Sequence, residues 1–214
     1  MGLRTQALEA LRDAVRQWPD NAIYREVLEG IENRYPQTGV IELQSAGTIT
    51  CYTYRWPLII GRGEEAALRL SSPMVSRAHA EIALLGDQPY ARAISDKGGL
   101  RYRGEDQQPA ALTGHGVLEI AGVPIDCEVS EVSVKLQPVH EEGRSCIGLL
   151  KPDWLHDGIQ LRRDEEDRIV IRQQPNVTLN GDAVHQDTPL LIDDEIVHNH
   201  SRYKVVGPRS HHPR

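Results

Sequence analysis

The first part of the chain carries apolar residues at helical spacing. Between residues 3 and 35, apolar side chains recur every three or four positions, which predicts two helices. They are Leu8, Leu11, Val15 and Trp18, followed by Ile23, Tyr24, Val27, Leu28 and Ile31. Pro19 separates the two helices, and Asp20 or Asn21 is a candidate N-cap for the second. The pattern predicts an N-terminal α-helical hairpin over residues 1–38, and it resembles a single tetratricopeptide unit.

From Val40 the pattern changes to short segments in which apolar and polar residues alternate. Segments of this kind lie at 40–44, 48–54, 57–61, 68–70, 79–85, 90–94, 99–103, 116–122 and 123–129. Gly, Pro, Asp and Ser separate them, and no long helical pattern lies between them. Short, evenly spaced strands predict a mainly β fold, namely an antiparallel β-sandwich. We expect this first β domain to span residues 39–131.

The second half of the chain echoes the first. Arg103-Gly104 recurs as Asn180-Gly181, and the spacing from Leu112 to Val117 equals that from Leu191 to Ile196. The echo predicts a second sandwich in tandem over residues 132–207. The last residues, 208–214, are expected to form a flexible tail.

Composition narrows the classes of function. The net charge of −7 argues against non-specific nucleic-acid binding. No apolar run is long enough to span a bilayer, and the N-terminus has no signal-peptide core, so we expect a cytoplasmic protein without membrane insertion. The segment from Arg55 to Arg103, however, contains eight basic and five acidic residues. This local excess of positive charge suits a small anionic ligand. Cys51, Cys127 and Cys146 have no spacing typical of a disulfide framework or a zinc site, and each is expected to be buried.

One motif carries most of the functional information. An apolar segment ends in Gly61-Arg62, and fourteen residues after Arg62 the sequence Ser76-Arg77-Ala78-His79 opens the next apolar segment. This spacing resembles the forkhead-associated (FHA) domain, a family of phosphothreonine readers. The resemblance implies that Arg62 contacts a phosphate and that Ser76 donates its hydroxyl. It further implies that His79 braces the loop from inside the domain.

Other residues have supporting roles in this interpretation. Arg77 is a third candidate for phosphate binding, and Gly61 allows tight backbone geometry at the strand end. The resemblance places the peptide against loops that contain Arg69, Gly98, Gly99 and Arg101. Arginine forms bidentate, charge-assisted hydrogen bonds with phosphate, which makes it the expected residue type.

The third loop departs from the family pattern. Gly98 stands where the family has the asparagine that holds the ligand backbone, and Leu100 stands at a threonine position. The lost amide removes hydrogen bonds on the order of 1 kcal/mol each. Arg101 and Arg103 are candidates to compensate through their charge. The second β domain shows no pair that matches Arg62 and Ser76, so we expect it not to bind phosphate.

Two functions remain open at this point. The first is a phosphothreonine-dependent adaptor in kinase signalling, which binds a phosphorylated protein or peptide and holds a second protein through the hairpin or second β domain. The alternative is a phospho-independent FHA-like scaffold subunit of a bacterial secretion machine or another assembly. No catalytic motif, cofactor site or metal site is predicted, and the protein is not expected to be an enzyme. His198 and His200, expected on one strand face, lack a third metal ligand.

Overall fold

The computed structural model describes residues 3–36, 39–97, 99–106, 108–140 and 143–207. Its contacts divide the chain into two compact units. One, the central β unit, contains residues 42–151. The other, the helical-β unit, combines residues 1–41 with residues 152–214. The expected tail at 208–214 lies outside the described residues.

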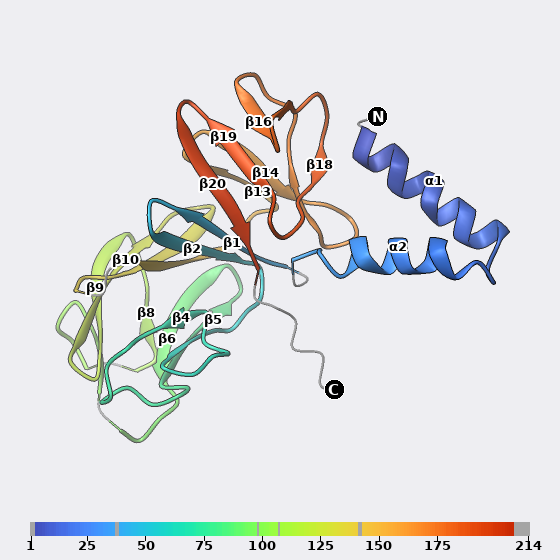
Figure 1. Cartoon of the computed structure of the whole chain (residues 1–214). Coiled ribbons are helices and arrows are strands. Elements are labelled where there is room, and N and C mark those ends of the chain that lie inside the picture. The colour runs from blue at the N-terminus through green and yellow to red at the C-terminus, as the bar shows by residue number, and fades with distance from the viewer. Residues whose placement is uncertain (1–2, 37–38, 98, 107, 141–142, 208–214) are drawn as a thin grey trace. The chain divides into compact units, whose positions relative to one another are not determined.

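The helical-β unit begins with the predicted pair of helices (Figure 1). α1 spans Leu3–Gln17 and α2 spans Ala22–Glu32. Of the two candidate caps, Asn21 is the one used, because its side-chain oxygen accepts hydrogen bonds from the backbone N–H groups of Ile23 (3.1 Å) and Tyr24 (3.4 Å). The helical hairpin is therefore confirmed, and its second helix starts at the residue that the sequence marked.

Two sets of four hydrogen-bonded antiparallel strands complete the described part of the helical-β unit. The first set has the order β17 (Asp182–Ala183), β16 (Val177–Leu179), β19 (Glu195–His198) and β20 (Ser201–Val206), and it is part of an 11-stranded sheet. The second has the order β13 (Asp153–His156), β14 (Ile159–Arg163), β15 (Ile169–Ile171) and β18 (Thr188–Pro189). β19 ends at His198, and Asn199 and His200 turn with positive φ. The expectation that His198 and His200 share one strand face is therefore wrong.

A buried carboxylate anchors α1 within the helical-β unit. The Asp194 side chain is fully buried, and the Arg4 guanidinium donates to both of its oxygens at 2.6 and 2.9 Å. The Asn180 amide and the Leu191 backbone N–H donate to the same carboxylate, each at 2.8 Å. A buried charge is tolerated only when its hydrogen-bonding capacity is met in this way. These contacts fix the first turn of α1 to the β19 end of the sheet.

The central β unit contains the other seven strands of the 11-stranded sheet and a separate five-stranded sheet. The larger has the order β1 (Val40–Ser45), β2 (Thr48–Thr53), β12 (Arg144–Leu149), β11 (Ser133–Pro138), β10 (Val123–Val129), β9 (His115–Ile120) and β7 (Leu100–Tyr102). The smaller has the order β4 (Leu68–Arg69), β3 (Leu58–Gly61), β5 (Ala80–Leu85), β6 (Gln88–Ala93) and β8 (Ala110–Ala111). The β12–β2 and β3–β4 pairs are parallel, and the other described pairings within these sheets are antiparallel.

The core of the central β unit lies between these two sheets. Fully buried aliphatic residues of the smaller sheet, such as Ile60 and Ile82, belong to one apolar cluster with Leu118 and Leu136 of the larger sheet. Aliphatic side chains of this kind drive sheet packing because they remove apolar surface from water. The predicted mainly β fold with an N-terminal helical pair is confirmed. No helix in the described part of the chain has the length and apolarity needed to cross a membrane.

The contacts divide the chain differently from the boundaries expected after residues 38 and 131. β11 and β12 belong to the central β unit because β11 pairs with β10, and β12 lies between β11 and β2. The helical hairpin shares its unit with residues 152–207. The echoed dipeptides do adopt one conformation, since Arg103 and Gly104, like Asn180 and Gly181, have positive φ angles between 52° and 89°.

Candidate functional site

The end of β3 and the segment before β5 are joined through their backbones. The Arg62 N–H donates to the Ser76 carbonyl at 3.0 Å, and the Gly63 N–H donates to the Arg77 carbonyl at 2.9 Å. These bonds continue the β3–β5 pairing beyond the ends of the two strands. The structure therefore brings Arg62 and Ser76 together, although fourteen residues separate them in the sequence.

Gly61 makes this close approach possible. A Cβ atom at this position would lie 2.7 Å from the Arg77 carbonyl carbon and 2.9 Å from the Ser76 oxygen, and real Cβ atoms essentially never come so close. Both neighbours are backbone atoms, so no side-chain rotation relieves the contact. Glycine is required at position 61 because a side chain has no space there.

His79 holds three segments together from inside the unit. Its side chain is fully buried, and its Nδ1 atom accepts a hydrogen bond from the Ser76 N–H at 3.0 Å. Its own N–H donates to the Ile60 carbonyl at 2.9 Å, while its carbonyl accepts from the N–H groups of Ile94 (2.9 Å) and Ser95 (3.1 Å). The position of His79 thus fits the bracing role that the resemblance implies.

A second serine, which the sequence did not single out, lies beside Ser76. The hydroxyl oxygens of Ser76 and Ser95 are 2.7 Å apart, and the Lys97 N–H donates to the Ser95 hydroxyl at 3.2 Å. Since the Ser95 oxygen already accepts a bond from Lys97, its single proton is free to point at Ser76. That direction leaves the Ser76 proton available to an external acceptor.

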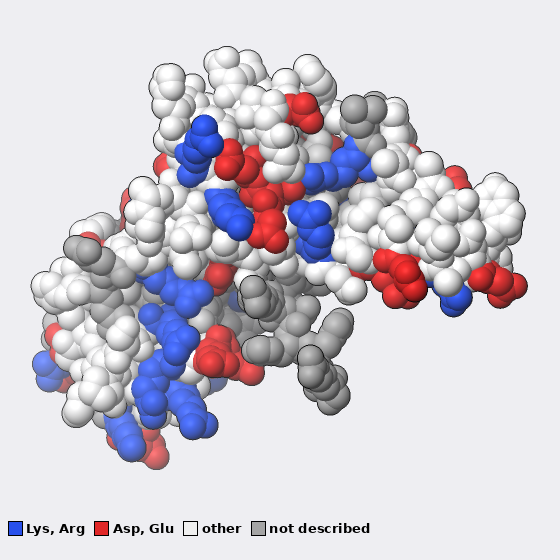
Figure 2. All heavy atoms as spheres, in the orientation of Figure 1, with Lys and Arg blue, Asp and Glu red and all other residues white. Residues whose placement is uncertain are grey.

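Three arginines line one hollow of about 720 Å³ at this end of the unit. Arg62, Arg69 and Arg77 share it with Glu64 and Glu65. All three arginines are exposed, and within the described ranges their guanidinium groups form no hydrogen bond or ion pair. Figure 2 shows Lys and Arg side chains gathered on one face of the central β unit, over the part that carries β4, β5 and β6 in Figure 1. Such a surface attracts anions.

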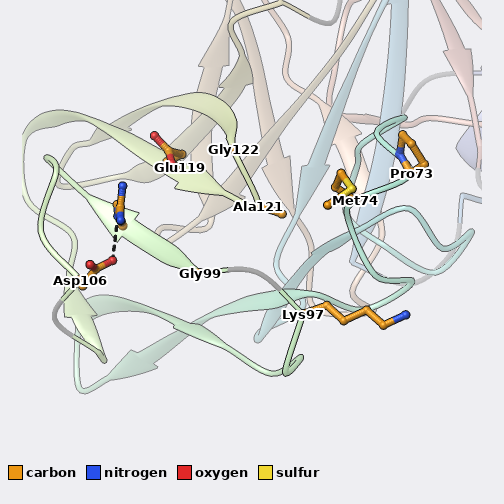
Figure 3. A pocket seen from close by; sticks show the side chains of 9 residues that line it. Pro73, Met74, Lys97, Gly99, Asp106, Glu119, Ala121 and Gly122 are labelled. Carbon is orange, nitrogen blue, oxygen red and sulfur yellow. Dashed lines mark hydrogen bonds and ion pairs between the residues drawn. The ribbon is translucent and has the colours of Figure 1, made fainter.

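Of the residues predicted to contact the peptide, Arg69 lines the first hollow, and two others line a different hollow of about 510 Å³ (Figure 3). Gly99 and Arg101 lie there with Met74, Lys97 and Glu119 among the other lining residues. Lys97 points away from the acidic side chains of this hollow in Figure 3. The predicted residue Gly98 lies outside the described residues.

The two arginines expected to compensate for the lost asparagine are occupied elsewhere. Arg101 forms an ion pair with Asp106 at 2.9 Å, and this carboxylate raises the pKa of the Arg101 guanidinium. Arg103 donates to the Thr113 and His115 carbonyls at 2.6 and 2.8 Å. Lys97 has no ion pair among the described residues and is the cation nearest to Ser95 in sequence.

Solved structures that are similar to this chain include two FHA domains. No family model and no curated protein matches the chain. One structure, from a "structural and functional analysis of phosphothreonine-dependent FHA domain interactions", is 27% identical, with a TM-score of 0.35 over 42% of this chain and 97% of that chain. The other, FHA-1 of Mycobacterium tuberculosis Rv1747, is 18% identical, with a TM-score of 0.31 over 41% of this chain and 86% of that one. The chain is similar to FHA domains over these shares of its length.

Proposed function

We propose that the central β unit binds a phosphothreonine segment of a partner protein, with the phosphate between Arg62 and Ser76. The observation that supports this proposal is their shared backbone pairing, in which the Arg62 N–H donates to the Ser76 carbonyl at 3.0 Å. A phosphate dianion offers three strong acceptor oxygens. The guanidinium fork fits two of them, and the Ser76 hydroxyl fits the third.

The surroundings of the two residues favour this ligand. His79 and Gly61 fix the loop from below, so little ordering is needed on binding. Arg77 lines the same hollow as Arg62 and adds a further cation there. The peptide on either side of the phosphothreonine would then contact Arg69 and the loop that contains Gly99.

We also propose that binding is the whole activity of this unit, with no reaction catalysed. A second protein would be held by the helical hairpin. Trp18, Ile23 and Val27 are 55%, 68% and 48% exposed, and no described residue of α2 is buried. An adaptor in kinase signalling needs two binding surfaces, one for each protein that it joins.

Three buried, free cysteines suit a reducing compartment such as the cytoplasm.

One observation favours the alternative, a phospho-independent scaffold. The Ser76 hydroxyl already has a partner in Ser95 at 2.7 Å, and a site that needs no ligand is satisfied by such a bond. The direction of this hydrogen bond separates the two functions. Only if Ser95 is the donor is the Ser76 proton available to phosphate.

The test is isothermal titration calorimetry with a peptide selected from a library degenerate around a fixed phosphothreonine. The phosphorylated peptide should bind and its unphosphorylated counterpart should not. Hydrogen bonds to charged groups contribute about 1.5–3 kcal/mol, so Arg62→Ala should weaken binding by roughly 10- to 150-fold.

A matched variant controls for the loss of one positive charge. Lys135 is exposed on β11 and forms no ion pair among the described residues, so Lys135→Ala should leave binding unchanged. If the phosphorylated and unphosphorylated peptides bind equally, or if the library yields no enriched peptide, the result supports the phospho-independent scaffold instead.

A further inference from the structure

The three arginines of the hollow form a row across three neighbouring backbone segments. β4 pairs with β3 so that Arg69 lies opposite Gly61, directly before Arg62. On the other side of β3, the Gly63 N–H donates to the Arg77 carbonyl. Arg62 therefore lies between Arg69 and Arg77. Neighbouring strands are about 4.8 Å apart, so the backbone of this arginine row spans about 10 Å.

The charges of the arginine row are available, in contrast to those of other arginines in the same unit. Arg92 is paired with Glu81 at 2.6 Å, Arg101 with Asp106 at 2.9 Å and Arg144 with Glu42 at 2.7 Å. Within the described ranges, none of the three arginines in the row is paired, although two glutamates line the same hollow. Unpaired cations at this density repel one another and favour an anionic ligand.

One phosphate does not use the whole row. A phosphothreonine carries a charge of about −1.5 to −2 at neutral pH. The Arg62 fork and the Ser76 hydroxyl meet its three oxygens, which leaves the two outer guanidinium groups without a partner. In an extended peptide each residue advances about 3.3 Å, so an acidic side chain one or two residues away reaches the next backbone segment of the row.

We infer that the ligand is an acidic phosphopeptide, in which Arg69 and Arg77 read anionic groups on the two sides of the phosphothreonine. This inference rests on the proposed function of Arg62 and Ser76. The anionic groups are carboxylates of Asp or Glu, or a second phosphoryl group, because both offer oxygens to a guanidinium fork. The arginine row then selects among phosphothreonine sites by the charge of their neighbours.

The experiment compares peptides that share one phosphothreonine and differ only in the flanking residues. One peptide carries Ala on both sides, a second carries Glu and a third carries phosphoserine. An unphosphorylated peptide with Glu flanks is the fourth. Exposed ion pairs contribute modestly, so the wild-type protein should bind the Glu-flanked peptide roughly two- to fivefold more tightly per carboxylate than the Ala-flanked peptide. The ratio should fall as the salt concentration rises. A larger gain with phosphoserine than with Glu identifies the second phosphoryl group as the preferred neighbour.

Single substitutions test which arginines produce the preference for acidic flanking residues. Arg69→Ala and Arg77→Ala should each weaken binding of the Glu-flanked peptide more than binding of the Ala-flanked peptide, and so lower the ratio between the two affinities. Lys135→Ala should keep the wild-type ratio. A ratio near one in the wild type, or an unchanged ratio in both arginine variants, overturns the inference while phosphothreonine binding itself stands. If the unphosphorylated acidic peptide binds as tightly as the phosphorylated one, or no phosphothreonine peptide binds, the proposed function fails, and the inference fails with it.

Discussion

Substitution of Gly61 by alanine tests whether the two segments of the site are held as closely as their backbone contacts indicate. The added Cβ would lie 2.7 Å from the Arg77 carbonyl carbon and 2.9 Å from the Ser76 oxygen. To relieve these contacts, the segment before β5 must move away from β3. That movement breaks the bonds from Arg62 N–H to Ser76 and from Gly63 N–H to Arg77.

The expected cost follows from these two effects. Overpacking against backbone atoms costs about 1–3 kcal/mol. The two lost hydrogen bonds contribute about 1 kcal/mol each to net stability. Gly61→Ala should therefore lower the free energy of unfolding of the central β unit by about 4 kcal/mol. Any protein that remains folded should lose phosphopeptide binding, because the arginine and serine no longer meet.

The assay is a urea titration of the ¹⁵N-labelled protein, followed through amide resonances of β3 and β5. Gly99→Ala is the control, since a Cβ at Gly99 meets no neighbouring atom within 4 Å. Its free energy of unfolding should stay within about 1 kcal/mol of the wild type. If Gly61→Ala unfolds at the same urea concentration as Gly99→Ala, the close pairing of the two segments is refuted.

Three further outcomes are expected. Ser95→Ala should weaken phosphopeptide binding by roughly fivefold in calorimetry, because Ser76 loses the hydrogen bond that holds its hydroxyl in place. Ser95→Thr keeps a hydroxyl at this position and should restore binding. Arg4→Ala should lower the free energy of unfolding of the helical-β unit by about 3 kcal/mol, because Asp194 stays buried without its cation. Arg16→Ala removes an exposed ion pair and should change this free energy little, and urea unfolding measures both variants. Burial lowers the pKa of His156 below about 6.5, against the opposing effect of Asp157. The unfolded chain then binds more protons, so the stability of this unit should be complete above pH 6.5 and fall as pH drops from there to the lowered pKa. Thermal melts should show that His156→Gln removes this loss and that exposed His115→Gln does not.

The local parts of the fold follow from the sequence. Alternating apolar residues and Gly or Pro breaks place β3, β5 and β10 within one or two residues of their observed bounds, because these signals depend on neighbours along the chain. The parallel insertion of β12 next to β2 leaves no such signal. It depends on a pairing between residues such as Cys51 and Cys146, which lie far apart in the sequence. The expected boundary near residue 131 differs from the observed division for this reason.

The candidate site, like the fold, could be predicted only in part. The spacing from Arg62 to Ser76 and the resemblance that it carries predicted which backbone segments meet. The role of Ser95 was missed because a serine in a polar loop is indistinguishable by type from a turn residue. The occupation of Arg101 and Arg103 by Asp106 and by backbone carbonyls also could not be predicted, since side-chain partners depend on packing.

The central claim is that a guanidinium and a hydroxyl meet at one rim of the sandwich and receive a phosphate. An NMR titration of the ¹⁵N-labelled protein with matched phosphothreonine and threonine peptides tests it most directly. With the phosphorylated peptide only, the Arg62 side-chain Nε–H resonance and the amides of Gly63, Ser76 and Arg77 should shift together and saturate. Equal shifts with both peptides, or shifts confined to strands away from this rim such as β11, would contradict it.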